Sequence, residues 1–429
     1  MASPTTTDTA TRAAASPTVT RVTSPGGLEA WLVEEHAVPL VALEFAFLGG
    51  ASQDPAGRPG VANLLSGLLD EGAGPHDSDA FQNLLADRAI ELRFYADRDT
   101  LRGSLKALTT HLPAAIDLLR LAVNEARLDA DAVARVRGQV EAGLRHELYN
   151  PDSLAGRAFF ANAFPGHPYG RPTRGTIESV GAITRDDLAA YGAQALARDN
   201  LRVAAVGAIS ADTLAQVLDD VFGPLPAAAR LTPVADVTAA SPGGRQVIDV
   251  DVPQSVVRFG GRGLKRLDAD YLPGYVMNHI LGGGVFSARL FREVREKRGL
   301  AYGVSSSLVP MRHSALFLGG TATKNERVAE SLEVIAAEIG KLAADGPDAE
   351  ELRLAKQYLI GSYALHFDTS TKIAGQLLQI AVEGLGMDYI DRRNDLIEAI
   401  TAEDVRRAGT RFLAPNELIV VVAGRPVGV

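Results

Sequence analysis

Hydrophobic and polar positions along the chain follow two different periods. Alternation of apolar residues predicts a β-strand over residues 41–48, because successive side chains of a strand point to opposite faces. Short continuous apolar runs predict strands buried on both faces at 201–206 and 418–423. Helical spacing of apolar residues predicts helices over 113–128 and 329–342. Strands near both ends of each half, with helices grouped between them, indicate the α+β fold class.

The second half of the chain repeats the first half. Residues 183–188 (ITRDDL) return as 400–405 (ITAEDV), an offset of 217 positions. Residues 200–207 return as 416–424 with one inserted residue, and the two helical segments named above keep the same register. Matches of several elements in one register are the mark of an internal repeat. We therefore expect a duplicated domain of about 210 residues.

The repeat also predicts the domain boundaries. The residues between the two copies are rich in Ala, Pro and Thr and have no periodic apolar face, which is typical of a linker. The first residues are rich in Ala, Thr and Ser and lack the apolar centre of a signal peptide. The expected parts are a flexible leader (1–20), an N-terminal α+β domain (21–223), a linker (224–244) and a C-terminal α+β domain (245–429). The compartment stays open: the periplasm if a signal was removed, otherwise the cytoplasm.

Composition excludes several kinds of site. The 429 residues include no cysteine, which excludes disulfides, thiolate metal sites and cysteine nucleophiles. The eight histidines are never closer than 21 positions, so no two can face one zinc ion from a single helix. The net charge of −9 argues against a nucleic-acid binder. No apolar run approaches the roughly 18 residues that span a membrane.

Three consecutive glycines, Gly282, Gly283 and Gly284, form the most unusual local sequence. Glycine permits positive φ angles and the close approach of another backbone. The segment is not a phosphate-binding loop, because Lys and Ser/Thr do not follow at the required spacing. From the glycines alone we interpret it as a flexible turn before a helix.

The helix expected after these glycines has Phe286 and Phe291 on its apolar face. Arg295 lies about 40° around the helix from Phe291, so it should flank that face. Gly299 is suited to the position just after the helix end, and Tyr302 should follow in a strand. The residues by themselves favour a solvated basic helix end and a sheet tyrosine.

The string LFREVREKRGLAYGV at 290–304 resembles the second-half motif of the pitrilysin/insulinase-type metallopeptidases, in their mitochondrial-processing-peptidase-like branch. The resemblance covers the chain from about residue 20 and includes the HPYG string at 167–170 with Gly175. It implies two homologous α+β halves, each a mainly antiparallel sheet packed with helices. This agrees with the internal repeat.

The resemblance also implies roles for individual residues. In this family an Arg and a Tyr seven residues apart reach the zinc site, and Arg295 and Tyr302 match that pair. A glycine-rich segment is thought to handle substrate, and the matching residues here are Gly282, Gly283, Gly284 and Phe286.

The zinc-binding motif of the family is missing from the first half. An active member carries His-x-x-Glu-His, and the residues at those positions are Asn63, Ser66 and Gly67. Asn is a poor zinc ligand, Ser cannot act as a carboxylate base, and Gly has no side chain. The third ligand would fall near Glu141 or Glu147, but an isolated carboxylate does not hold zinc. We therefore expect no metal or other cofactor in this chain.

Together these features imply the non-zinc subunit of a two-chain peptidase. A zinc-bearing homologous subunit would be its partner in a heterodimer that encloses a chamber. Arg295 and Tyr302 would donate hydrogen bonds to the scissile carbonyl oxygen as it becomes an oxyanion. An extended peptide substrate would add as a strand to an exposed sheet edge. Two alternatives stay open: a structural or assembly subunit like the core proteins of respiratory complexes, and a protein that binds peptides without cleaving them.

Overall fold

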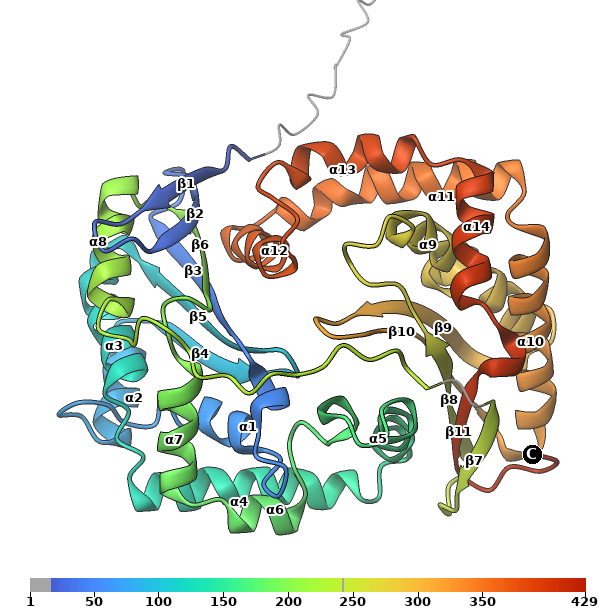
Figure 1. Ribbon diagram of the computed structural model, residues 1–429, viewed down its shortest axis with the longest axis horizontal. Coiled ribbons are helices and arrows are strands. Elements are labelled where there is room, and N and C mark those ends of the chain that lie inside the picture. Colours follow the sequence, from blue (N-terminus) through green and yellow to red (C-terminus); the bar gives the residue numbers. More distant parts are fainter. Residues whose placement is uncertain (1–16, 241–242) are drawn as a thin grey trace, which may run out of the picture.

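The residues that the structure describes form two β-sheets, each packed with helices (Figure 1). The structure is a computed structural model that describes residues 17–240 and 243–429. The first sheet consists of β1 (Thr20–Thr23), β2 (Glu29–Glu34), β3 (Leu40–Leu48), β4 (Glu91–Ala96), β5 (Thr100–Leu108) and β6 (Leu201–Gly207). The second consists of β7 (Gly244–Ile248), β8 (Gln254–Arg262), β9 (Ala301–Pro310), β10 (Ala315–Lys324) and β11 (Ile419–Ala423).

The two sheets have the same topology. The strand order is β1-β2-β6-β3-β5-β4 in the first sheet and β7-β11-β8-β10-β9 in the second. Without β1 the orders correspond strand by strand, and the single parallel pair of each sheet, β2 with β6 and β7 with β11, falls at the same place. All other pairs are antiparallel. The expected α+β class with two homologous halves and mainly antiparallel sheets is confirmed.

The helices follow the same repeat. Those of the first half are α1 (Val61–Ser66), α2 (Ser78–Asp87), α3 (Leu112–Asn124), α4 (Ala130–Glu147), α5 (Pro151–Ala163), α6 (Ile177–Ala182), α7 (Arg185–Ala195) and α8 (Ala211–Phe222). Those of the second half are α9 (Tyr271–Asn278), α10 (Val328–Asp345), α11 (Ala349–Gly361), α12 (Ser370–Glu383), α13 (Tyr389–Glu398) and α14 (Ala402–Phe412). None of these helices is both long and apolar enough to cross a membrane.

The repeated ITxxD string is a helix start. Thr184 precedes α7 and Thr401 precedes α14, and each accepts a hydrogen bond from the backbone N–H three residues on. The side chains of Asp187 and Asp404 accept from the threonine N–H in return. This reciprocal capping box satisfies backbone donors that have no partner inside the helix. The sequence repeat therefore reflects the same local structure in both halves.

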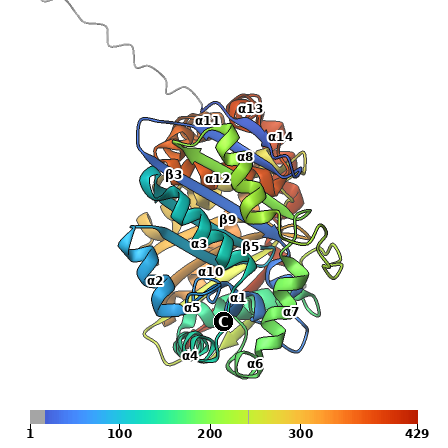
Figure 2. The same ribbon diagram turned by 90° about the vertical axis from the view of Figure 1, so that its left-hand side faces the viewer.

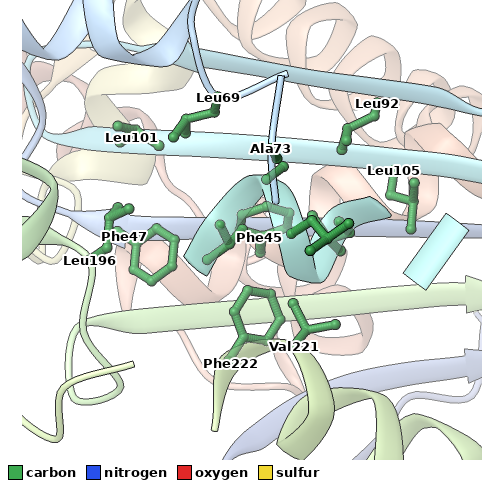
Figure 3. Close-up of a cluster of buried hydrophobic side chains, with 14 of the residues drawn as sticks. Phe45, Phe47, Leu69, Ala73, Leu92, Leu101, Leu105, Leu196, Val221 and Phe222 are labelled. Carbon is green, nitrogen blue, oxygen red and sulfur yellow. The ribbon is translucent and has the colours of Figure 1, made fainter. Parts of the chain in front are cut away.

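A cluster of aromatic rings forms the centre of the first core (Figure 3). The ring of Phe45 lies 5.2 Å from Phe222 and 6.0 Å from Phe47, in edge-to-face geometry. Gly103 on β5 leaves space for that ring, since a Cβ there would lie 2.0 Å from Cζ of Phe45. Helices α3 and α8 cover this face of the sheet, on the side turned away from the second half (Figures 1 and 2).

Each half supplies one helix to the sheet of the other half. Helix α12 packs on β3 and β6 of the first sheet, and α5 packs on β8 and β11 of the second, so both lie between the two sheets (Figure 1). The layer under α12 combines small sheet residues with larger helix residues, namely Ala42, Ala46, Ala204, Leu377 and Leu378. The halves therefore share two of their hydrophobic cores.

The connection between the halves is hydrogen-bonded to both of them, to the second half through the Val237 N–H, which donates to the His313 backbone oxygen at 2.9 Å. Residues 224–240, within the linker expected at 224–244, contain no helix or strand, and β7 already begins at Gly244. Thr232 exchanges two hydrogen bonds with the side chain of Gln53 in the first half, at 2.7 and 3.1 Å. Of the leader expected at 1–20, residues 1–16 lie outside the described part of the chain.

Candidate functional site

The positions of the missing zinc motif are packed as an ordinary helix. Asn63 and Ser66 lie in α1, and the Ser66 hydroxyl donates a 2.8 Å hydrogen bond to the backbone oxygen of Asn63. Gly67 ends α1 against α4, where an added Cβ would lie 3.3 Å from Val136 Cγ1. An amide, a hydroxyl turned back on its own helix and a glycine do not supply the ligands that zinc requires.

The two candidate third ligands are engaged in ion pairs. Glu141 pairs with Arg145 at 3.0 Å, one turn along α4. Glu147 pairs with Arg157 at 3.3 Å and also with Arg174. Within the described ranges, 17–240 and 243–429, no group of three or more His, Cys, Asp or Glu residues could hold a metal ion. The residues present therefore do not fit a zinc site.

Two of the three glycines, Gly282 and Gly283, are helical, so the interpretation as a flexible turn is wrong for them. Helix α9 continues into a π-helical turn, His279–Gly283, and Gly284 follows it. None of the three glycines has a positive φ angle. The need for glycine is steric at Gly282, where an added Cβ would lie 2.5 Å from the Ser306 Oγ and 2.7 Å from its backbone N on β9. The close approach of another backbone that glycine permits is found at Gly282, where β9 is the neighbour.

The segment that follows is helical but not a regular α-helix. Phe286 lies in a short 3-10 turn, Val285–Ser287, and a π-helical stretch, Phe291–Glu296, comes next. Gly299 adopts φ +59° directly after the helical segment, as its position in the sequence predicted. The N–H of Leu300 donates to the Val294 oxygen at 2.8 Å and closes the helix end. Tyr302 then lies in strand β9.

Arg295 and Tyr302 are in direct contact. The guanidinium carbon of Arg295 lies 4.5 Å from the ring centroid of Tyr302 and 4.8 Å from that of Phe291. Phe286 contacts Phe291 edge-on at 5.1 Å. We call these four residues the arginine–aromatic cluster. Cation–π attraction holds the guanidinium between two rings, although Tyr302 is 85% and Phe286 69% exposed.

Arg295 differs from its cationic neighbours in its charge environment. Lys297 and Arg298 both bind Glu293, and their hydrogen bonds lower the pKa of that carboxyl to about 2. Arg295 makes no ion pair or hydrogen bond through its side chain to any residue that the structure describes. Its N–H donors therefore remain available for a ligand. The sequence could have predicted part of this difference, because Glu293 and Lys297 lie four residues apart on a helix, whereas Arg298 lies five residues from Glu293.

The cluster sits beside an edge of the second sheet. Strand β9 pairs with β10 and is the last strand in the order of that sheet, as β4 is in the first. In the described part of the chain, no hydrogen bond, ion pair or cation–π contact joins Arg295 or Tyr302 to Asn63, Ser66 or Gly67. The structure thus places the Arg/Tyr pair and the missing zinc motif in separate halves.

Two family models match most of the described chain. Residues 32–177 match the model described as insulinase, peptidase family M16, and residues 182–359 match the model described as the peptidase M16 inactive domain.

The relatives include proteins named as proteases and a protein named as a non-peptidase. The chain is 28% identical to an uncharacterized zinc protease of Mycobacterium leprae, over 94% of this chain and 91% of that protein. It is 26% identical to a non-peptidase homolog of Helicobacter pylori, over 87% of this chain and 86% of that protein. A crystal structure of a peptidase M16 inactive domain from Pseudomonas fluorescens superposes with a TM-score of 0.90 at 29% identity, covering 96% and 98% of the two chains.

Proposed function

This chain belongs to the insulinase family of peptidases, peptidase family M16, and from that premise we propose that it is the non-zinc-binding subunit of a heterodimeric zinc metallopeptidase. A homologous partner would hold the zinc ion and the general base. This chain would contribute substrate contacts and the Arg295–Tyr302 pair. The match of residues 182–359 to an inactive domain and the unsuitable residues at Asn63, Ser66 and Gly67 support this division.

The exposed arginine–aromatic cluster is the observation that carries the proposal. A guanidinium held between two rings, with its N–H donors unengaged by the described residues, is oriented in advance for a ligand oxygen. When a peptide bond is hydrolysed, the carbonyl oxygen gains negative charge, and donors placed beforehand stabilise that charge. Arg295 N–H and Tyr302 O–H would be two such donors.

The adjacent sheet edge supports binding of an extended peptide. Because β9 pairs with a described strand on one side, its other side can accept the backbone hydrogen bonds of an added strand. The helical stretch that carries Arg295 is preceded in the chain by Gly282, Gly283, Gly284 and Phe286, so these residues lie near the Arg295–Tyr302 pair. We propose that Gly283, Gly284 and Phe286 contact the substrate, whereas Gly282, expected to do the same, is buried against β9.

The test uses the full chain, alone and with a copurifying zinc-bearing homologue from the native source. The chain alone should contain no stoichiometric zinc and should cleave no peptide, and the mixture should be active. Arg295→Ala or Tyr302→Phe should lower kcat about 10²–10³-fold, the usual cost of losing one oxyanion donor. Arg298→Ala and Tyr149→Phe are matched controls that should keep activity, because Arg298 is bound to Glu293 and Tyr149 lies outside the cluster.

Two results would contradict the proposal in different ways. Zinc-dependent cleavage by the isolated chain would show that the interpretation of Asn63, Ser66 and Gly67 is wrong. Full activity of the Arg295 and Tyr302 variants in the mixture would remove the oxyanion role alone.

The similarity to a non-peptidase homolog favours a second candidate, a subunit that binds peptides or supports assembly without cleavage. Copurification with a multi-subunit membrane complex, in place of a single zinc-binding homologue, would support it.

A further inference from the structure

An arginine-rich cavity lies between α5, the end of α4 and residues 170–175. Its volume is about 270 Å³, and the charged residues that line it are Arg98, Arg157, Arg171, Arg174 and Glu147. Four guanidinium groups thus face one carboxylate in a chain whose net charge is −9. Arg171 and Arg174 follow the HPYG string and Arg157 precedes it in α5, whereas Arg98 comes from a distant part of the sequence.

Arg98 is held in place by uncharged groups and forms no ion pair with a described residue. Its guanidinium carbon lies 3.6 Å from the ring centroid of Phe160, and its Nε donates to the backbone oxygen of Tyr169 at 3.3 Å. The neighbouring Asp99 accepts a 2.5 Å hydrogen bond from the Tyr169 hydroxyl and does not line the cavity. Neither terminal nitrogen of Arg98 has a hydrogen-bond partner or ion pair among the residues described here. Burial lowers the pKa of Arg98, and the nearby charges of Asp99 and Asp97 offset this effect only in part.

The other three arginines leave the cavity positive. Arg157 and Arg174 share the single carboxylate of Glu147. Arg171 donates at 2.8 Å to the backbone oxygen of Asp54. Burial lowers the pKa of Arg171, and the Asp54 carboxyl group, which does not line the cavity, offsets this effect in part. A fixed guanidinium fork with free N–H groups matches the two oxygens of a carboxylate.

We propose that this cavity binds a carboxylate group of a peptide, either an acidic side chain or the C-terminal carboxylate. The proposal rests on the proposed function in one respect, that peptides are the ligands of this chain. A volume of about 270 Å³ lies just below the range typical of whole small-molecule sites, and it suits one anionic side chain better than a larger ligand. The site lies in the first half of the chain, apart from the arginine–aromatic cluster, and would select substrates by charge.

The experiment measures peptide binding to the full chain by titration calorimetry, without a partner. Three nine-residue peptides share one sequence: one with a central Glu and an amidated end, one with Gln and an amidated end, and one with Gln and a free C-terminus. We expect the Kd of the Glu peptide, the free-end peptide or both to be about tenfold or more below that of the amidated Gln peptide. Which of them binds identifies the source of the carboxylate.

Variants place the binding in the cavity. Arg98→Gln should weaken the preferred peptide about tenfold or more, and Arg98→Lys should restore only part of the affinity because it lacks the fork. Arg353→Gln is the matched control, since it removes the same charge from the exposed surface of α11, and it should bind like the wild type. If thermal melting shows that Arg98→Gln is unfolded, Arg157→Gln, whose side chain is 31% exposed, takes its place.

The proposal is overturned by equal affinity for all three peptides, by unchanged binding in the cavity variants, or by an equal loss in Arg353→Gln. Binding of inorganic phosphate without any peptide preference would also overturn it. Its failure is separable from that of the proposed function, because no zinc-bearing partner or cleavage enters the measurement.

Discussion

An aromatic ring lies over a glycine of the neighbouring strand at equivalent places in both halves. Phe45 on β3 pairs with Gly103 on β5, and Phe259 on β8 pairs with Gly319 on β10. Both rings are fully buried. Because the pairs sit at the same point of the duplicated sheet, Gly103→Ala and Gly319→Ala are two independent trials of the same physical effect.

The structure gives the size of the expected effect. A Cβ would lie 2.0 Å from Phe45 Cζ at Gly103 and 2.2 Å from Phe259 Cζ at Gly319, far inside van der Waals contact. Each ring must therefore turn away within a packed core, where overpacking typically costs about 1–3 kcal/mol. We expect each variant to lose about 3 kcal/mol of unfolding free energy, the upper end of that range, because the ring atoms meet the new methyl group directly.

Urea denaturation followed by circular dichroism measures this loss as a lower midpoint at unchanged slope. Gly138→Ala is a control that should change the unfolding free energy in the opposite direction. Gly138 lies exposed in the interior of α4 with nothing within 4 Å of its added Cβ, so alanine should stabilise the protein by about 0.5–1 kcal/mol. Midpoints at Gly103→Ala and Gly319→Ala equal to or above the wild-type value would refute the packing argument.

Two further predictions concern the shared cores and pH. Leu377→Ala in α12 should lower the unfolding free energy by about 2–5 kcal/mol. The loss should appear as a lower unfolding midpoint in the fluorescence of Trp31, the single tryptophan, which lies in the other half. An unchanged Trp31 midpoint would contradict the shared core. Burial raises the pKa of Asp54 to about 6 from 3.8, so its contribution to stability is complete below about pH 4 and is lost as the pH rises through 6. Chemical denaturation of the wild type and of Asp54→Asn at several pH values measures this effect. The difference in unfolding free energy, wild type minus variant, should fall by up to about 3 kcal/mol between pH 4 and 7. If the two proteins show parallel pH profiles, the raised pKa of Asp54 is wrong.

Local sequence patterns predicted the elements that are stabilised by residues close in the sequence. The strand expected at 41–48 is β3, and the repeated ITxxD string forms the same capping box before α7 and α14. The helix expected over 113–128 ends earlier, at Asn124. Gly282 and Gly283 were assigned wrongly to a turn, because Gly282 packs against β9, which the local sequence does not show.

Residue identity was sufficient for the duplication and for the loss of the zinc motif, since Asn63, Ser66 and Gly67 lack suitable donor atoms in any conformation. The tertiary structure decided three things: that the halves exchange α5 and α12, that the guanidinium of Arg295 lies over the ring of Tyr302 on β9, and that four arginines converge on one cavity. The physical reason is that these contacts depend on distances between side chains from separate elements. Those distances are set by how helices and sheets pack, and no local period along the chain encodes them.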